Sequence, residues 1–288
     1  MSDQPESAPP TCFRHPDRIS YITCTRCGRP ICPECMVAAP VGFQCSSCVA
    51  GAASLRVAPT TVAGGQYIVK PRVTYALIGL NVALFLLQYL GGVNEVAGDW
   101  GMWPVGIAVG GEWWRLLTGA FLHGSFLHIA FNMYVLFALG PTLERVLGHV
   151  RYLMLYLIAA LGGGVASYAL SDMRTVSVGA SGAIFGLMGA LIVAGRRLNY
   201  DIKQVIILLG INVVIGFLAP GVDWRAHLGG LITGAAVAAV FVLVPRRHRV
   251  LWQTLGILGI LGALMCVTIW RTVQIMDFVS PFGLTINT

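Results

Sequence analysis

Seven long apolar runs, separated by short stretches of charged or turn-forming residues, dominate the chain from about residue 73 onward. A helix of about 20 residues spans a hydrocarbon core of about 30 Å, so most of these runs are long enough to cross a membrane, while the fifth is short. The pattern predicts an all-α polytopic membrane protein. The expected spans are Val73–Leu90, Ser125–Leu143, Tyr152–Leu170, Val176–Ala194, Gln204–Leu218, Arg225–Val244 and Leu251–Trp270.

The polar and small residues around these runs predict how the chain is organised. Between the first two runs, the segment 91–124 is too polar to span, and its four tryptophans suit a membrane–water interface. We expect five parts: a disordered, Pro-rich N-terminus (1–11), a Cys/His module (12–50), a linker (51–70), a six-helix membrane core (71–245), and a further transmembrane helix with a tail (246–288).

Composition supports a lipid environment. The chain is 56% hydrophobic and only 11% charged, and its mean hydropathy is +0.75. Soluble domains have about 25% charged residues, so most of this chain is expected to lie in lipid. The net charge of +7 is explained by the excess of Lys and Arg in the cytosolic loops of membrane proteins, and no nucleic-acid partner is expected.

The distribution of Lys and Arg predicts the orientation. If the N-terminus is cytosolic, the inner loops carry eight basic residues and the outer loops carry four. The positive-inside rule therefore favours a multi-pass protein of the cell membrane with a cytosolic N-terminus and, after seven spans, an extracytoplasmic C-terminus. The inner set is Arg145, Arg151, Arg196, Arg197, Lys203, Arg246, Arg247 and Arg249, and the outer set is Arg115, Arg174, Arg225 and Arg271.

Three of the predicted spans place polar residues at one depth. Counted from the inner ends at roughly 1.5 Å per residue, His128, Asn132, Ser181 and His227 all lie roughly 18–27 Å above the inner boundary. Each residue alone is explained as a polar group that helps two helices pack. Ionisable residues within a membrane, however, are costly and usually face a cavity, and a serine with an adjacent histidine is a usual nucleophile and base. Small residues spaced at four, in GAIFG (182–186) and around AHLGG (226–230), would let the helices approach closely.

The motifs GASG (179–182), AHLGG (226–230), HIAFN (128–132) and Trp114-Arg115 together resemble the rhomboid family of intramembrane serine proteases over about residues 70–245. The six-span core with one added C-terminal span is similar to a known variant of that family. The resemblance implies that Ser181 is the nucleophile and His227 its general base, in a dyad without an acid. We interpret Asp223, four residues before His227, as a loop or interface acid.

The same resemblance assigns further roles. It implies that His128 and Asn132 donate hydrogen bonds to the oxyanion, together with the Ser181 backbone N–H. His123 would be a neighbouring structural or water-ordering residue, and Trp114-Arg115 would brace the interfacial loop. Glu144 and Arg145 would cap the inner end of the second span. No cofactor is expected to take part in catalysis.

Seven of the eight cysteines and one histidine form four ligand pairs in the N-terminal module. Clustered pairs on a cytosolic side indicate thiolate metal ligands, because disulfides are rare there. Eight ligands fit two structural, tetrahedral Zn²⁺ ions, and the spacing resembles a B-box-type zinc finger. We expect cross-brace pairing, with sequential pairing as the alternative. The first site would comprise Cys12, His15, Cys32 and Cys35, and the second Cys24, Cys27, Cys45 and Cys48.

The sequence therefore predicts an intramembrane serine endopeptidase that cleaves transmembrane helices of other membrane proteins near the outer face. The alternative is a catalytically silent rhomboid-like adaptor, which would be expected to lack part of the catalytic set. A transporter is a third and less favoured interpretation, because the polar groups of a transporter should lie near the bilayer midplane, between structural repeats. The zinc module is a candidate site for a cytosolic protein partner.

Overall fold

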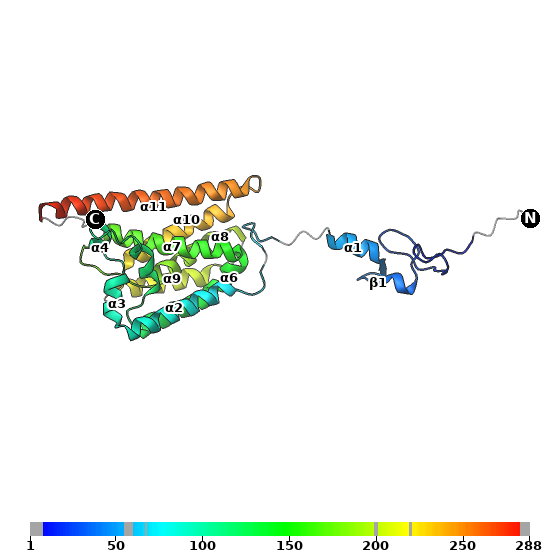
Figure 1. Ribbon diagram of the computed structural model, residues 1–288, viewed down its shortest axis with the longest axis horizontal. Helices are drawn as coiled ribbons and strands as arrows, with labels where there is room; N and C mark the ends of the chain where they lie inside the picture. Colours follow the sequence, from blue (N-terminus) through cyan, green and yellow to red (C-terminus); the bar gives the residue numbers. More distant parts are fainter. Residues whose placement is uncertain (1–7, 55–59, 67, 199–200, 219–220, 283–288) are drawn as a thin grey trace, which may run out of the picture. The chain divides into compact units, whose positions relative to one another are not determined.

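The chain divides into two units, Met1–Ala58 and Pro59–Thr288, and each is described by itself. The computed structural model describes residues 8–54, 60–66, 68–198, 201–218 and 221–282 (Figure 1). The predicted tail beyond residue 282, and most of the N-terminus predicted to be disordered, lie outside these residues.

The first unit is built around its cysteines. A 3₁₀ turn, η1 (Pro33–Cys35), leads into an antiparallel hairpin of β1 (Met36–Ala38) and β2 (Phe43–Cys45), in which Met36 pairs with Cys45. Helix α1 (Ser46–Ser54) follows directly. The buried core consists of Ile31 and the side chains of five cysteines, so its apolar content alone is small for a unit of this size.

The second unit is helical. Among the described residues, six helices are long and apolar enough to cross a membrane, which confirms the predicted polytopic fold (Figure 1). The remaining predicted span, the fifth, corresponds to the shorter α9 (Lys203–Leu218). The six are α2 (Arg72–Leu90), α6 (Phe126–Leu147), α7 (His149–Leu170), α8 (Ser181–Leu198), α10 (Trp224–Val242) and α11 (Arg249–Val279).

The largest differences from the predicted boundaries lie in the fourth and the last span. The fourth span was expected to begin at Val176, but α8 begins at Ser181, because Ser177 pairs with Met102 in an extended bridge and Gly179 adopts φ +136°. The last span was expected to end at Trp270, but α11 continues to Val279. No proline occurs after Pro245 until Pro281, so nothing breaks the helix where its apolar run ends.

Helices α7, α8 and α10 form the centre of the second unit. In the apolar window of α8, 67% of residues are buried, compared with 11% in α11, which lies along one side of the bundle (Figure 1). Lipid removes most of the hydrophobic driving force between helices, so close van der Waals packing must hold them together. A Cβ at Gly230 would collide with the Gly182 backbone, and a Cβ at Gly234 with the Gly186 backbone. The backbones of α8 and α10 are therefore in direct contact.

The polar segment between the first two long helices folds into short helices, α3 (Val93–Trp100), α4 (Pro104–Ala108), α5 (Arg115–Thr118) and η2 (Gly119–Phe121). Arg115 is buried and donates hydrogen bonds to the carbonyls of Gly98 (2.7 Å) and Gly101 (3.0 Å) as well as to Glu112. It thus braces the segment, whereas Trp114 is half-exposed.

At the other end of the bundle, a buried carboxylate links three of the long helices. Glu144, near the end of α6, accepts hydrogen bonds from the backbone N–H groups of Val73 (2.9 Å) and Thr74 (2.8 Å), from the Thr74 hydroxyl (2.6 Å) and from His149 (2.6 Å). A carboxylate at a helix N-terminus satisfies otherwise unpaired N–H groups and complements the helix dipole. Glu144 therefore caps α2 and links it to α6 and α7.

We predict that Gly234→Ala destabilises the bundle, because the added methyl group must separate α8 from α10, at a cost of about 1–3 kcal/mol. The matched control is Gly259→Ala on α11, where a Cβ meets nothing within 4 Å. Alanine there should be neutral or stabilising by up to about 1 kcal/mol. Thermal unfolding in detergent, followed by circular dichroism, measures both. Equal midpoints for the two variants would contradict the tight α8–α10 contact.

Candidate active site and metal centres

Ser181 and His227 meet at the N-terminal ends of two adjacent helices. Ser181 is the first residue of α8, and His227 lies in the first turn of α10. The distance between Ser181 Oγ and His227 Nε2 is 2.8 Å. With the proton of the imidazole on Nδ1, the serine hydroxyl donates to Nε2, which is the arrangement that a nucleophile and its general base require.

An aromatic ring fixes the plane of the histidine. Phe185 stacks on His227 with ring centroids 4.2 Å apart and an interplanar angle of 11°. Phe185 follows Ser181 by four residues and therefore lies on the same face of α8. Sequence reasoning missed this residue, although an aromatic four positions after the candidate serine was the available signal.

Asp223 has a structural role at the start of α10. Its carboxylate accepts the Arg225 N–H (3.1 Å) as the N-cap, and the hydroxyl of Ser167 from α7 also donates to it. These bonds are consistent with the interpretation of Asp223 as a loop or interface acid. They hold the first turn of α10, which carries His227, against α7.

His128 lies beside the serine, on the first turn of α6. The hydroxyl of Ser125 caps this helix by accepting the His128 N–H (3.2 Å), and the His128 Nδ1 accepts the N–H of Gly124 (3.3 Å). Because Nδ1 is an acceptor, the ring proton resides on Nε2, which makes Nε2 a donor. A Cβ built on Gly179 would lie 2.8 Å from this Nε2 and 3.5 Å from Ser181 Oγ, so both atoms face the same small space.

Asn132 and His123 also lie near this space, and they differ in their hydrogen bonding. Asn132 is buried one turn below His128, and its amide donates one hydrogen bond to the His128 carbonyl (2.9 Å), leaving a second amide hydrogen. His123 is fully buried, with its ring centroid 5.1 Å from that of His128, and neither of its ring nitrogens has a hydrogen-bond partner among the described residues.

An apolar cavity of about 170 Å³ opens beside His227. It lies between α8, α9 and α10, on the side of the histidine that faces α9. The cavity is large enough to receive an apolar side chain. It is lined by Phe185, Val213, Gly216, Trp224, His227, Leu228 and Leu231.

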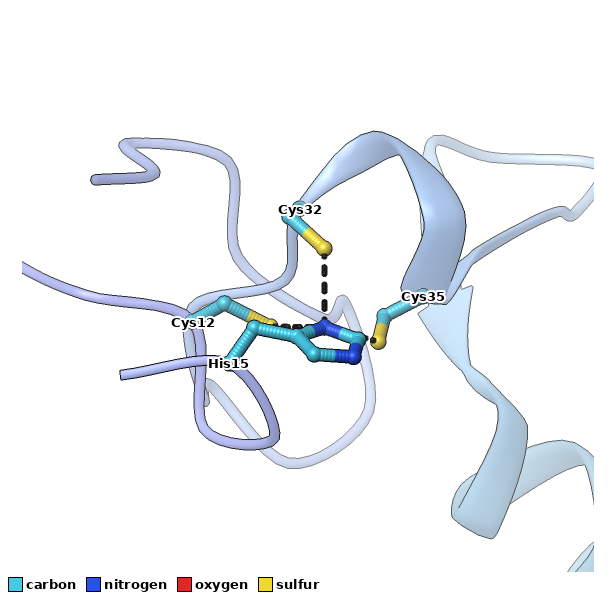
Figure 2. Close-up of side chains that lie close together, drawn as sticks. All are labelled: Cys12, His15, Cys32 and Cys35. Atoms are coloured by element: carbon cyan, nitrogen blue, oxygen red, sulfur yellow. Dashed lines mark hydrogen bonds between the residues drawn. The ribbon is translucent and has the colours of Figure 1, made fainter. Parts of the chain in front are cut away.

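In the first unit, the eight predicted ligands form two groups of four, and in each group the ligand atoms lie within 4.8 Å of one another. The groups combine the first pair with the third and the second pair with the fourth, which is the cross-brace arrangement and not the sequential one. Figure 2 shows one group, with the imidazole directed at three sulfurs. The groups are Cys12, His15, Cys32 and Cys35, and Cys24, Cys27, Cys45 and Cys48.

The distances between ligand atoms fit a tetrahedral metal ion. His15 Nδ1 lies 3.3, 3.5 and 3.9 Å from the sulfurs of Cys32, Cys35 and Cys12. In the other group, the sulfurs of Cys27 and Cys45 are 3.9 Å apart. Tetrahedral zinc with ordinary bond lengths places N and S about 3.6 Å apart and two S atoms about 3.8 Å apart. These groups can therefore hold metal ions.

The protonation of the thiols is uneven within each group. Burial tends to raise the pKa of Cys12, but backbone hydrogen bonds outweigh it and lower the pKa to about 6. Burial, followed by the neighbouring Cys12, raises the pKa of Cys35 to about 11. In the second group, the pKa of Cys24 is likewise lowered to about 6, whereas the neighbouring Cys45, followed by burial, raises that of Cys48 to about 12. Each group therefore resists full ionisation unless a cation balances the thiolates.

Comparison with known proteins identifies the family of the membrane unit. The family described as "Rhomboid domain" matches residues 110–246. "Rhomboid protease GluP" of Bacillus subtilis is 37% identical over 182 residues, which cover 60% of this chain and 36% of GluP. "Putative rhomboid protease YdcA" of the same organism is 38% identical over 144 residues, or 48% of this chain and 71% of YdcA. "Rhomboid protease AarA" of Providencia stuartii is 29% identical over 211 residues, or 62% of this chain and 75% of AarA. The chain thus spans about a third of the length of GluP, and the Cys/His module precedes the matched family region.

We predict that Gly179→Ala lowers the reactivity of Ser181 toward a fluorophosphonate probe by about 100-fold, because small displacements of a reacting group can cost this much. At φ +136° a side chain is strained, and its Cβ would displace the His128 ring. The control is Gly262→Ala, where a Cβ meets nothing within 4 Å. Equal labelling of Gly179→Ala and the control would show that His128 and Ser181 are not coupled through this glycine.

Proposed function

Since this chain belongs to the rhomboid family, we propose that it is an intramembrane serine endopeptidase with Ser181 as nucleophile and His227 as general base. The observation that carries the proposal is the 2.8 Å contact between Ser181 Oγ and His227 Nε2 at the ends of two membrane helices. A hydroxyl is a weak nucleophile unless an adjacent base removes its proton, and this contact provides that base.

In the proposed reaction, His227 accepts the proton of Ser181 as the hydroxyl oxygen attacks the peptide carbonyl, and then donates it to the leaving amine. Stacking on Phe185 keeps the imidazole aligned for both transfers. The tetrahedral oxyanion would be stabilised by His128 Nε2–H and by the backbone N–H of Ser181. The free amide hydrogen of Asn132 would provide a third donor. Hydrogen-bond donors of this kind contribute about 3 kcal/mol each in comparable sites.

The substrates would be transmembrane segments of other membrane proteins, cleaved near the outer face. The helical form of such a segment hides its amides, so it must unwind locally before the serine can reach a carbonyl. The cavity beside His227 offers space for an apolar side chain of the unwound segment. The excess of inner Lys and Arg supports a cytosolic N-terminus, which places the ends of α6, α8 and α10 that carry the site near the extracytoplasmic surface.

We expect Ser181→Ala and His227→Ala each to reduce cleavage of a transmembrane model substrate by about 1,000-fold or more, and the double variant to be no worse, because the two residues act as one unit. Ser280→Ala, at an exposed serine beyond the membrane helices, is the matched control. Cleavage is measured by gel electrophoresis in proteoliposomes, with unfolding midpoints to verify the fold. A folded Ser181→Ala variant that still cleaves would refute the nucleophile. A wild-type chain that binds substrate but neither cleaves it nor reacts with a fluorophosphonate would instead support the silent adaptor.

We infer that the first unit binds two Zn²⁺ ions and that both are structural. The donors are thiolates and one imidazole, which favour zinc, and each group supplies four protein ligands, so no position remains open for a substrate. The ions would hold together a unit whose apolar core consists mainly of its own ligands.

Elemental analysis of the purified protein should find two zinc ions per chain. Cys24→Ser should lower this number to about one, because it removes one ligand of the second group, and Cys266→Ser, outside both groups, should leave it at two. A variant lacking residues 1–58 should contain no zinc and keep its basal cleavage, because the catalytic pair lies in the other unit. Zinc retained after this deletion would contradict the assignment.

A further inference from the structure

A short turn at the start of the second unit is packed against the ends of the helices opposite to the active site. Thr60 and Gln66 form a bridge that closes this turn, and the Thr61 hydroxyl accepts the N–H of Gly65 (3.0 Å). Ala63 is fully buried, and its carbonyl accepts a hydrogen bond from the Gln253 side chain of α11 (3.0 Å). The turn is therefore a fixed part of this end of the bundle.

Two arginines from different helices converge on this turn. A Cβ at Gly64 would lie 2.7 Å from a terminal guanidinium nitrogen of Arg249, and a Cβ at Gly65 would lie 3.3 Å from one of Arg151. Arg151 is near the start of α7, and Arg249 is the first residue of α11, one turn before Gln253. Both groups are positively charged and lie against neighbouring residues of one turn, so they repel each other.

The positive charge of this pair is not balanced by any acid in the described part of the chain. Arg151 donates two hydrogen bonds to the Gln253 carbonyl oxygen (3.1 and 3.0 Å), and the Gln253 amide is already bonded to the carbonyls of Ala63 and Phe241. Gln253 is neutral and has no further donor to offer. The Nε of Arg249 is buried without a hydrogen-bond partner among the described residues. None of the ion pairs in the described part of the chain involves Arg151 or Arg249.

We propose that Arg151 and Arg249 form a binding site for a phosphate group, supplied by the headgroup of an anionic phospholipid. Arg249 Nε is buried without a hydrogen-bond partner among the described residues, which is costly, and the planar set of guanidinium donors matches phosphate oxygens in a bidentate manner. The pair lies where helices α7 and α11 begin, at the end of the bundle that we assign to the inner membrane surface. Basic pockets between helices at this level are suited to lipid headgroups. The bound phosphate would relieve the repulsion and fix the turn at 60–66 against α7 and α11.

The test compares the delipidated protein with Arg151→Gln/Arg249→Gln and with the matched control Arg197→Gln/Arg246→Gln. The control removes the same charge from exposed arginines. Phosphatidylglycerol binding is measured by native mass spectrometry and by the shift of the unfolding midpoint. We expect wild type and control to bind equally, and the site variant to bind at least about tenfold more weakly, the equivalent of one charge-assisted hydrogen bond. If the double variant fails to fold, Arg249→Gln alone serves, because Arg249 Nε makes no hydrogen bond within the described residues.

Inorganic phosphate distinguishes the source of the ligand. If millimolar phosphate displaces phosphatidylglycerol from the wild type, this result would support a site that binds the phosphate group of the lipid headgroup. If inorganic phosphate stabilises the wild type but not the site variant, and the lipid adds nothing, the arginines bind phosphate and the lipid assignment is wrong. Equal binding of the lipid by the site variant, or an equal loss in the control, would overturn the proposal.

Discussion

The direct backbone contact between α8 and α10 sets the geometry on which the site depends. Gly182 and Gly186 on α8 face Gly230 and Gly234 on α10, and no side chain separates the two helix backbones. At this distance, a short serine side chain and a histidine on the neighbouring helix can meet at 2.8 Å. Any larger residue in this contact would move the nucleophile away from its base, even though none of these glycines takes part in the chemistry.

Polar groups at the two ends of the bundle complement this packing. Because apolar surfaces gain little by meeting each other in lipid, hydrogen bonds that satisfy buried polar groups help to select one arrangement of the helices. Glu144 binds α2, α6 and α7 at one end, and Arg115 braces the short helices at the other. Gln253 gives the added helix α11 a similar connection, through α7 and the turn at 60–66. The seventh span thus joins the core through specific hydrogen bonds as well as through apolar contacts.

The two units use different physical means to form a stable fold. The first buries little apolar surface and gathers eight metal ligands, whereas the second relies on close helix packing within a membrane. Residues 60–66, where the chain enters the membrane unit, are hydrogen-bonded to α11 through Gln253 and Ala63.

Much of this protein was determined by local sequence. Long apolar runs specify membrane helices wherever they occur, and paired cysteines at ligand spacing specify metal-binding groups, so both could be predicted without a fold. The prediction that Ser181, His227 and His128 share one depth came from counting residues along helices. The tertiary structure decided what depends on contacts between distant segments. The bridge between Met102 and Ser177, together with the φ of Gly179, starts α8 at the serine and not at Val176. The stacking of Phe185 on His227 and the meeting of Arg151 with Arg249 also arise only when separate elements pack. Periodicity and composition report the environment of one segment, and they carry no information about which atoms of another segment will face it.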